Sequence, residues 1–203
     1  MLRRILVWDW PQRIGHWLLA ICVAIAWASA ESDRLQLLHV LAGGCAGGIA
    51  AFRVLWGLVG SRHARFVNFL RGPTAVFGYL RSLLRRHPET HSGHNPAGGW
   101  AVLALLLLVL STAGSGWATY NDLAGHWLEE LHEGLAEGLL LLVGVHLGAV
   151  VLSSWRHREN LLRAMFDGYK QGSASEAIGS ARAWAVPLLL AAGMLAAYLA
   201  QAA

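Results

Sequence analysis

Five apolar stretches of membrane-spanning length dominate this 203-residue sequence. A helix needs about 20 apolar residues to cross the hydrocarbon core of a bilayer. Charged residues make up 14% of the chain, whereas a soluble domain carries roughly 25%. The sequence therefore predicts an all-α fold, a transmembrane helical bundle. The expected helices cover about residues 14–30, 38–60, 98–119, 131–153 and 183–201.

Basic residues gather in alternate connections between these stretches. Arginines precede the first stretch, and most other basic residues lie in 61–95 and 154–182. The two intervening loops are acidic or balanced. Because positively charged loops stay on the cytoplasmic side, we expect a bacterial inner-membrane protein with a cytoplasmic N-terminus and a periplasmic C-terminus. Topology and attraction to anionic membrane lipid account for the net charge of +4, so no nucleic-acid partner is expected.

Four histidines lie inside the apolar stretches: His16, His39, His132 and His146. An ionisable side chain at such depth usually has a function. His132 and His146 are 14 residues apart, so they project from one helix face about 21 Å apart. The expected topology puts His16 and His146 near the cytoplasmic side and His39 and His132 near the periplasmic side. The alternative is four separate core histidines, each hydrogen-bonded in its own place.

This arrangement predicts two bis-histidine haems, one held by His16 and His146 and the other by His39 and His132. Neutral imidazole nitrogens would bind each iron from opposite faces of the porphyrin. Two axial histidines leave no open position on iron, which favours electron transfer over oxygen chemistry. Two haems stacked along the membrane normal would form a transmembrane electron path.

Glycines and one arginine accompany the histidines. Gly43 and Gly47 share the helix face of His39, and a missing side chain lets a flat macrocycle approach the backbone. Close helix packing through small residues is the alternative. Arg53 lies 14 residues after His39, at the height of the inner haem, where a propionate is its expected counter-ion. Snorkelling to the interface is the alternative for Arg53.

Three connecting segments have recognisable patterns. Residues 74–86 place apolar side chains on one face against arginines, which predicts an interfacial amphipathic helix. The outer loop 120–130 carries Trp127 beside acidic residues and is a candidate docking surface. Residues 171–180 are rich in small residues and are expected to link a core of residues 1–170 to an accessory helix within 171–203.

Other polar groups carry less information. The histidines of HPETHSGH have spacing compatible with a metal site, but the segment lacks cysteine and a solvated loop is the preferred interpretation; they are His87, His91 and His94. Cys22 and Cys45 both fall within helices and are interpreted as small apolar residues.

The sequence resembles the bacterial cytochrome b561 family, which includes the cytochrome b subunits of membrane-bound nickel–iron hydrogenases. The resemblance covers about residues 6–170. It rests on LVWDWPQRIGHW around His16, LHVLAGG around His39, FRVLWGLVGSRHARFVNFLRGP from Phe52, GHNPAGG, and ELHEGLAEGLLLLVGVHLG in the fourth stretch. It implies a four-helix core with two b-type haems ligated by the four histidines. The fifth, C-terminal helix departs from this core, and packing or partner docking is its expected role.

The family also implies electron exchange between a periplasmic redox partner and the quinone pool. The partner could be a c-type cytochrome, a hydrogenase or another oxidoreductase, in a homo- or hetero-oligomer. Arg13 and residues 74–86 are the weak candidates for a quinone site. One alternative is a stand-alone superoxide:quinone oxidoreductase, so an enzymatic activity of the chain itself stays open. A non-haem scaffold or proton relay is the alternative outside redox chemistry.

Overall fold

The computed structural model describes residues 3–85 and 89–202. The longest helices are α1 (Trp10–Ser29), α2 (Gln36–Val59), α5 (Pro96–Tyr120), α6 (His126–His157) and α8 (Val186–Gln201). Shorter elements connect them: β1 (Arg3–Leu6), η1 (Asp33–Leu35), α3 (Phe66–Phe69), α4 (Pro73–Ser82), α7 (Leu161–Asp167), β2 (Tyr169–Gly172), η2 (Ala174–Glu176) and η3 (Ala183–Ala185). Arg86, His87 and Pro88, which end the expected interfacial helix and begin the histidine segment, lie outside the described residues.

Within the described residues, four helices are long and apolar enough to cross a membrane. They run over Asp33–Val59, Pro96–Tyr120, His126–His157 and Ala183–Gln201, and they confirm the predicted transmembrane helical bundle, including its C-terminal helix. Helix α1 has 20 residues but is not among the four, because Gln12, Arg13 and His16 make its first turns polar. That α1 crosses the membrane as a further span stays a prediction.

The fold divides into two compact units. Unit 1 comprises Met1–Arg13, Leu55–Ala104 and Leu142–Ala183; unit 2 comprises Ile14–Val54, Leu105–Leu141 and Trp184–Ala203. Each unit therefore draws on segments that are far apart in the sequence, and both use residues from each side of the expected boundary at residue 170.

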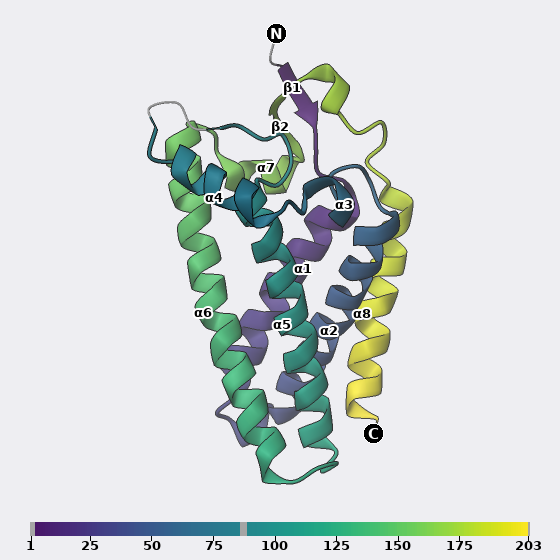
Figure 1. Ribbon diagram of the computed structural model, residues 1–203. Helices are drawn as coiled ribbons and strands as arrows, with labels where there is room; N and C mark the ends of the chain where they lie inside the picture. The colour runs from purple at the N-terminus through teal and green to yellow at the C-terminus, as the bar shows by residue number, and fades with distance from the viewer. Residues whose placement is uncertain (1–2, 86–88, 203) are drawn as a thin grey trace. The chain divides into compact units, whose positions relative to one another are not determined.

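A two-stranded antiparallel sheet joins the two sequence ends of unit 1. Strand β1 pairs with β2, with Arg3 opposite Gly172 and Leu6 opposite Tyr169 (Figure 1). Directly after β1, the buried carboxylate of Asp9 accepts hydrogen bonds from Trp56 Nε1 at 3.0 Å and from the Gln12 backbone N–H at 2.9 Å. These bonds satisfy a charge that is costly to bury alone, so they fix the chain where α1 begins.

Helix α4 begins at Pro73, whose missing N–H costs nothing at a first helical position. It ends at Ser82, a few residues before the limit expected from the sequence. Phe77, Leu80 and Leu84 are exposed, while Tyr79 is buried. The exposed apolar side chains agree with the interfacial helix expected for 74–86, whose contact with a membrane stays a prediction.

In unit 2, the C-terminal helix α8 packs on α2 through small residues, and the two helices lie side by side (Figure 1). A Cβ at Gly48 would lie 2.3 Å from the Ala192 carbonyl oxygen, and one at Gly44 would lie 2.7 Å from the Ala200 Cβ. Only glycine allows such an approach, which is how transmembrane helices commonly pack. Helix α8 therefore has the packing role considered for it from the sequence.

Candidate functional site

Two of the four apolar-segment histidines come together in unit 2. His39 lies on the second turn of α2 and His132 on the second turn of α6. Their ring centroids are 6.0 Å apart and their planes are inclined by 81°. Both side chains are half-buried. The site thus consists of two imidazoles that face each other from different helices.

Each of these imidazoles is oriented by a backbone carbonyl. His39 Nδ1 lies 2.8 Å from the Ala26 carbonyl oxygen near the end of α1. His132 Nδ1 lies 3.0 Å from the Thr112 carbonyl oxygen on α5, and 3.3 Å from Ser115 Oγ. A carbonyl oxygen only accepts, so Nδ1 must carry the proton in a neutral ring. In both rings Nε2 then keeps the lone pair with which a histidine binds a metal.

The spacing of the two rings fits one iron between them. A metal–imidazole bond is about 2 Å long and the ring centre lies roughly 1 Å beyond the nitrogen, so two opposed ligands have centroids about 6 Å apart. The observed separation is 6.0 Å. The hydrogen bonds from Nδ1 to carbonyl oxygens are also typical of metal-binding histidines. The donor set and its geometry therefore suit a bis-histidine haem.

Open space lies one helical turn beyond His39. A Cβ added at Gly43 would meet no atom within 4 Å. Gly47, on the same face one turn further, differs, because its added Cβ would lie 2.9 Å from the Ala113 Cβ of α5. The structure thus gives Gly47 a helix-packing contact, the alternative considered for it, and leaves open space at Gly43. A role of either glycine in cofactor binding stays a prediction.

Helix α5 contributes to the site although it has no histidine, and sequence reasoning missed this contribution. A Cβ at Gly116 would lie 2.7 Å from His132 Cε1, so this glycine lets α5 approach the imidazole. Thr112, one turn earlier, and Ser115, the preceding residue, meet the same ring. The sequence signal that could have found them is the run of small residues in STAGSG, residues 111–116.

The remaining candidates are placed within their own units. His16 lies on α1 in unit 2, with its ring 5.2 Å from that of Trp17. His146 lies on α6 in unit 1 and is half-buried. Arg53 packs its aliphatic stem against α1, where a Cβ at Gly15 would lie 3.3 Å from Arg53 Cδ. Haem ligation by His16 and His146, and a propionate contact of Arg53, stay predictions.

The histidines of the connection before α5 form a packed region of unit 1. The His94 ring lies 4.7 Å from Trp8 and 4.6 Å from Phe69. His63 Nε2 lies 2.8 Å from the Glu176 carbonyl oxygen. Burial lowers the pKa of His63 and of His91 below the usual histidine value. His91 and His94 are thus partly buried and not solvated as expected, and no cluster of three metal-ligating side chains occurs in residues 3–85 and 89–202.

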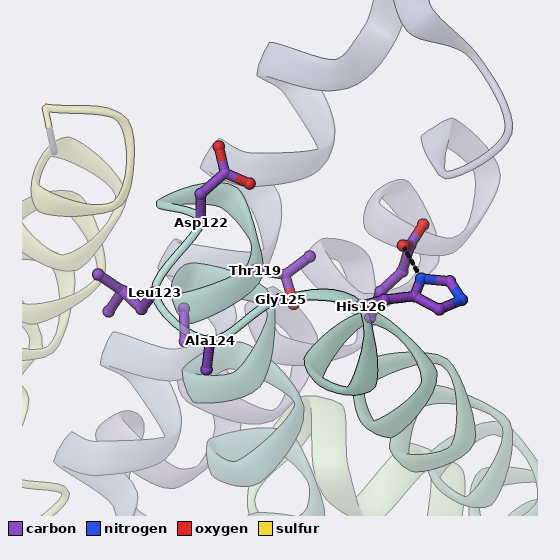
Figure 2. A pocket seen from close by; sticks show the side chains of 8 residues that line it. Thr119, Asp122, Leu123, Ala124, Gly125 and His126 are labelled. Carbon is purple, nitrogen blue, oxygen red and sulfur yellow. Dashed lines mark hydrogen bonds and ion pairs between the residues drawn. The ribbon is translucent and has the colours of Figure 1, made fainter.

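The turn between α5 and α6 encloses a hollow of about 240 Å³ in unit 2. Figure 2 shows the side chains of Asp122 and Leu123 on one side of this turn and that of His126 on the other. His126 Nδ1 lies 2.9 Å from Glu129 Oε2. Beside them, Trp127 is 59% exposed. The polar and aromatic character agrees with the docking surface expected for 120–130, and docking itself stays a prediction.

The two cysteines, expected as separate apolar residues, are neighbours in unit 2. Cys22 of α1 and Cys45 of α2 are hydrogen-bonded to each other through their side chains, and both are free thiols.

Comparisons with known proteins identify the family of this chain. A family model described as prokaryotic cytochrome b561 matches residues 7–168, a range that includes all four histidines. The chain is also 24% identical to a protein of Bradyrhizobium diazoefficiens described as a probable Ni/Fe-hydrogenase B-type cytochrome subunit, over 81% of this chain and 85% of that protein. No solved structure gives a significant match. The family match spans most of the sequence, and the chain belongs to the prokaryotic cytochrome b561 family.

Proposed function

We propose that this protein is a dihaem cytochrome that passes electrons between a periplasmic redox partner and the quinone pool of the inner membrane. As a family member it is a b-type membrane cytochrome of electron transfer. The proposal adds the number of haems, their ligands, the two exchange partners and the orientation in the membrane.

The observation that carries the proposal is the His39–His132 pair. Two imidazoles whose ring centroids are 6.0 Å apart have Nδ1 directed at backbone carbonyls, which leaves Nε2 of each ring available to bind a metal. A bound haem supplies reversible one-electron chemistry there. His39 and His132 would hold the haem iron between them and leave no position on it for water or oxygen, which favours electron transfer. The helices that supply these carbonyl groups fix the orientation of both imidazoles.

For the second haem we propose the pair His16 and His146. Helix α6 is uninterrupted over His126–His157, and the 14 residues between His132 and His146 correspond to a rise of about 21 Å. Such a rise suits one haem in each leaflet. On this proposal α1 is a membrane span, so five spans put the N-terminus in the cytoplasm and the C-terminus in the periplasm.

The proposed redox partners follow from the family and the topology. The relative described as a hydrogenase subunit supports a protein partner, and the turn around Asp122 and Trp127 is the proposed periplasmic docking surface. Quinone would exchange electrons at the cytoplasmic side, where Arg13 and residues 74–86 are the candidates. Superoxide is a weaker substrate candidate, because the acidic side chains of this turn, Asp122 and Glu129, repel an anion.

A haem count tests the ligand assignment. The purified protein should give two b-type haems per chain in a pyridine haemochrome assay. His132→Ala should give one, whereas His126→Ala, on the same helix and forming only exposed ion pairs with Glu129 and Glu130, should still give two. No haem in the unsubstituted protein would favour the scaffold or proton-relay alternative. Two haems in His132→Ala would refute ligation by His132.

A redox assay tests the exchange partners. Dithionite-reduced protein should be reoxidised by a soluble quinone analogue, and absence of reoxidation at every quinone concentration would remove the quinone claim. Haem reduction by superoxide, with continuous turnover of the purified chain alone, would instead support the stand-alone oxidoreductase.

A further inference from the structure

A second hollow, in unit 1, has a composition suited to an anion. It measures about 340 Å³ and lies between the turn that follows α2 and the segment 177–182. Ser61, Arg62 and Arg65 line it from the turn, and Arg182 lines it from the other segment. We call this hollow the arginine pocket.

Three guanidinium groups line the arginine pocket. No carboxylate belongs to its lining, so no lining residue neutralises their charge. Arg62 donates to the Ser175 carbonyl oxygen at 2.6 Å, and Arg182 donates to the Val59 carbonyl oxygen at 3.4 Å while its guanidinium lies 5.6 Å from the Trp56 ring centroid. Neutral partners position these groups without cancelling their charge. An anion that enters can therefore form charge-assisted hydrogen bonds.

The carboxylate of Glu176 lies outside the lining. It accepts hydrogen bonds from Ser92 Oγ at 2.8 Å and from the Ser173 backbone N–H at 3.0 Å. The hydrogen bond from Ser92 is the main reason that the pKa of Glu176 is lowered, and the charge of Arg62 is one of the smaller causes. Glu176 thus remains an anion held by these two donors beside the arginine pocket.

A buried hydroxyl group is the second, independent sign of a ligand. Ser61 is 2% exposed, and its Oγ has no hydrogen-bond partner within the described part of the chain. Buried polar atoms are nearly always hydrogen-bonded, because an unsatisfied one destabilises the folded state. Because Ser61 lines the pocket, a bound oxygen atom could accept its O–H.

An apolar surface adjoins this charge at the end of α2. Leu58 and Val59 are 63% and 71% exposed, and they belong to a helix that is long and apolar enough to span the membrane. Such side chains face acyl chains, and the arginines that follow them in sequence stand at headgroup level. We propose that the arginine pocket binds the phosphate of an anionic membrane lipid, whose acyl chains lie along Leu58 and Val59. The proposal requires α2 in a membrane and is independent of the haem ligands and of quinone.

The test uses native mass spectrometry of the detergent-purified, haem-loaded protein with added phosphatidylglycerol or phosphatidylcholine. Phosphatidylglycerol should bind at least about tenfold more tightly, because both lipids carry a phosphate but the choline cation of phosphatidylcholine offsets its charge and is repelled by the guanidinium groups. The double variant Arg65→Gln/Arg182→Gln should lose this preference. The control Arg81→Gln/Arg85→Gln, which removes the same charge from residues outside the pocket, should keep it.

Ser61→Ala removes no charge and should still weaken phosphatidylglycerol binding several-fold, with an unchanged haem spectrum as the check on folding. If the pocket and control variants lose the preference for phosphatidylglycerol equally, the lipid is attracted by the overall positive charge of the protein, and the proposal is overturned. Inorganic phosphate is the competing source of the same group. If it displaces phosphatidylglycerol at millimolar concentration and raises the unfolding temperature as the lipid does, the site binds free phosphate and the lipid assignment is overturned.

Discussion

The contact between Gly116 and His132 allows a sharp test of the haem site. An alanine Cβ at Gly116 would lie 2.7 Å from His132 Cε1 and 3.0 Å from its Nδ1. Ordinary van der Waals contact begins at 3.4 Å, so the imidazole or α5 must move by several tenths of an ångström. Gly114, two residues earlier on the same helix, provides the control, because its added Cβ meets no atom within 4 Å.

Overpacking of this kind typically costs about 1–3 kcal/mol. If the strain falls on ligation, haem affinity at the His39–His132 site drops by roughly 5- to 150-fold. Both substitutions gain about 1 kcal/mol of helix propensity over glycine, so a difference between them isolates the contact with the imidazole.

The assay is haem titration of the apoprotein, followed by optical redox titration. In Gly116→Ala, one of the two haems should bind with reduced affinity and have an altered midpoint potential. In Gly114→Ala, both affinities and both potentials should equal those of the unsubstituted protein. Unchanged haem affinity and potentials in Gly116→Ala would refute the view that His132, in this orientation, is a ligand. Equal changes in both variants would show that any alanine in α5 has this effect, and that the contact with His132 is not its cause.

Three further outcomes are expected. Ser115→Ala removes a competing donor from the Thr112 carbonyl oxygen, to which Ser115 Oγ donates at 3.1 Å. The bond from His132 Nδ1 to this oxygen then becomes stronger and the imidazole more basic, which should lower one haem midpoint potential, whereas the exposed Ser111→Ala should not. Gly48→Ala should lower the thermal unfolding temperature, since its Cβ would lie 2.3 Å from the Ala192 carbonyl oxygen, while Gly114→Ala should not. Stability should fall as pH drops below about 6.5, the unfolded histidine pKa, because burial lowers the folded pKa of His63 and His91 and the unfolded chain then binds more protons. Thermal unfolding between pH 5 and 8 checks this last expectation, and a pH-independent unfolding temperature would contradict it.

The long helices were predictable because hydropathy averaged over twenty residues is a strong signal, but their ends were not. The fourth stretch was expected at 131–153, and α6 runs from His126 to His157. The added turns at both ends are polar, and nothing breaks the helix there. Hydropathy marks the part of a helix that suits hydrocarbon, whereas backbone hydrogen bonding decides where the helix stops.

The sheet of unit 1 was beyond sequence reasoning for a different reason. Strands β1 and β2 have four residues each and are separated by most of the chain. Four residues give no usable period-two pattern, and their pairing depends on contacts such as the burial of Ile5 and Trp8. The same limit applied to the glycines. Gly43 and Gly47 share one helix face, yet only the position of Ala113 on another helix separates them.

The orientation of His39 shows why α1 belongs to the His39–His132 site without contributing a side chain to it. The last four carbonyl groups of a helix have no partner within the helix, and Ala26 is the first of these four in Trp10–Ser29. Its oxygen accepts from His39 Nδ1 and also from Ser29 Oγ at 3.2 Å. The imidazole therefore supplies a donor to a carbonyl that has no partner within the helix backbone. The position where α1 ends consequently fixes which nitrogen of His39 carries the proton. Because every residue type has a backbone carbonyl, a search of the sequence for polar side chains could not find this contact.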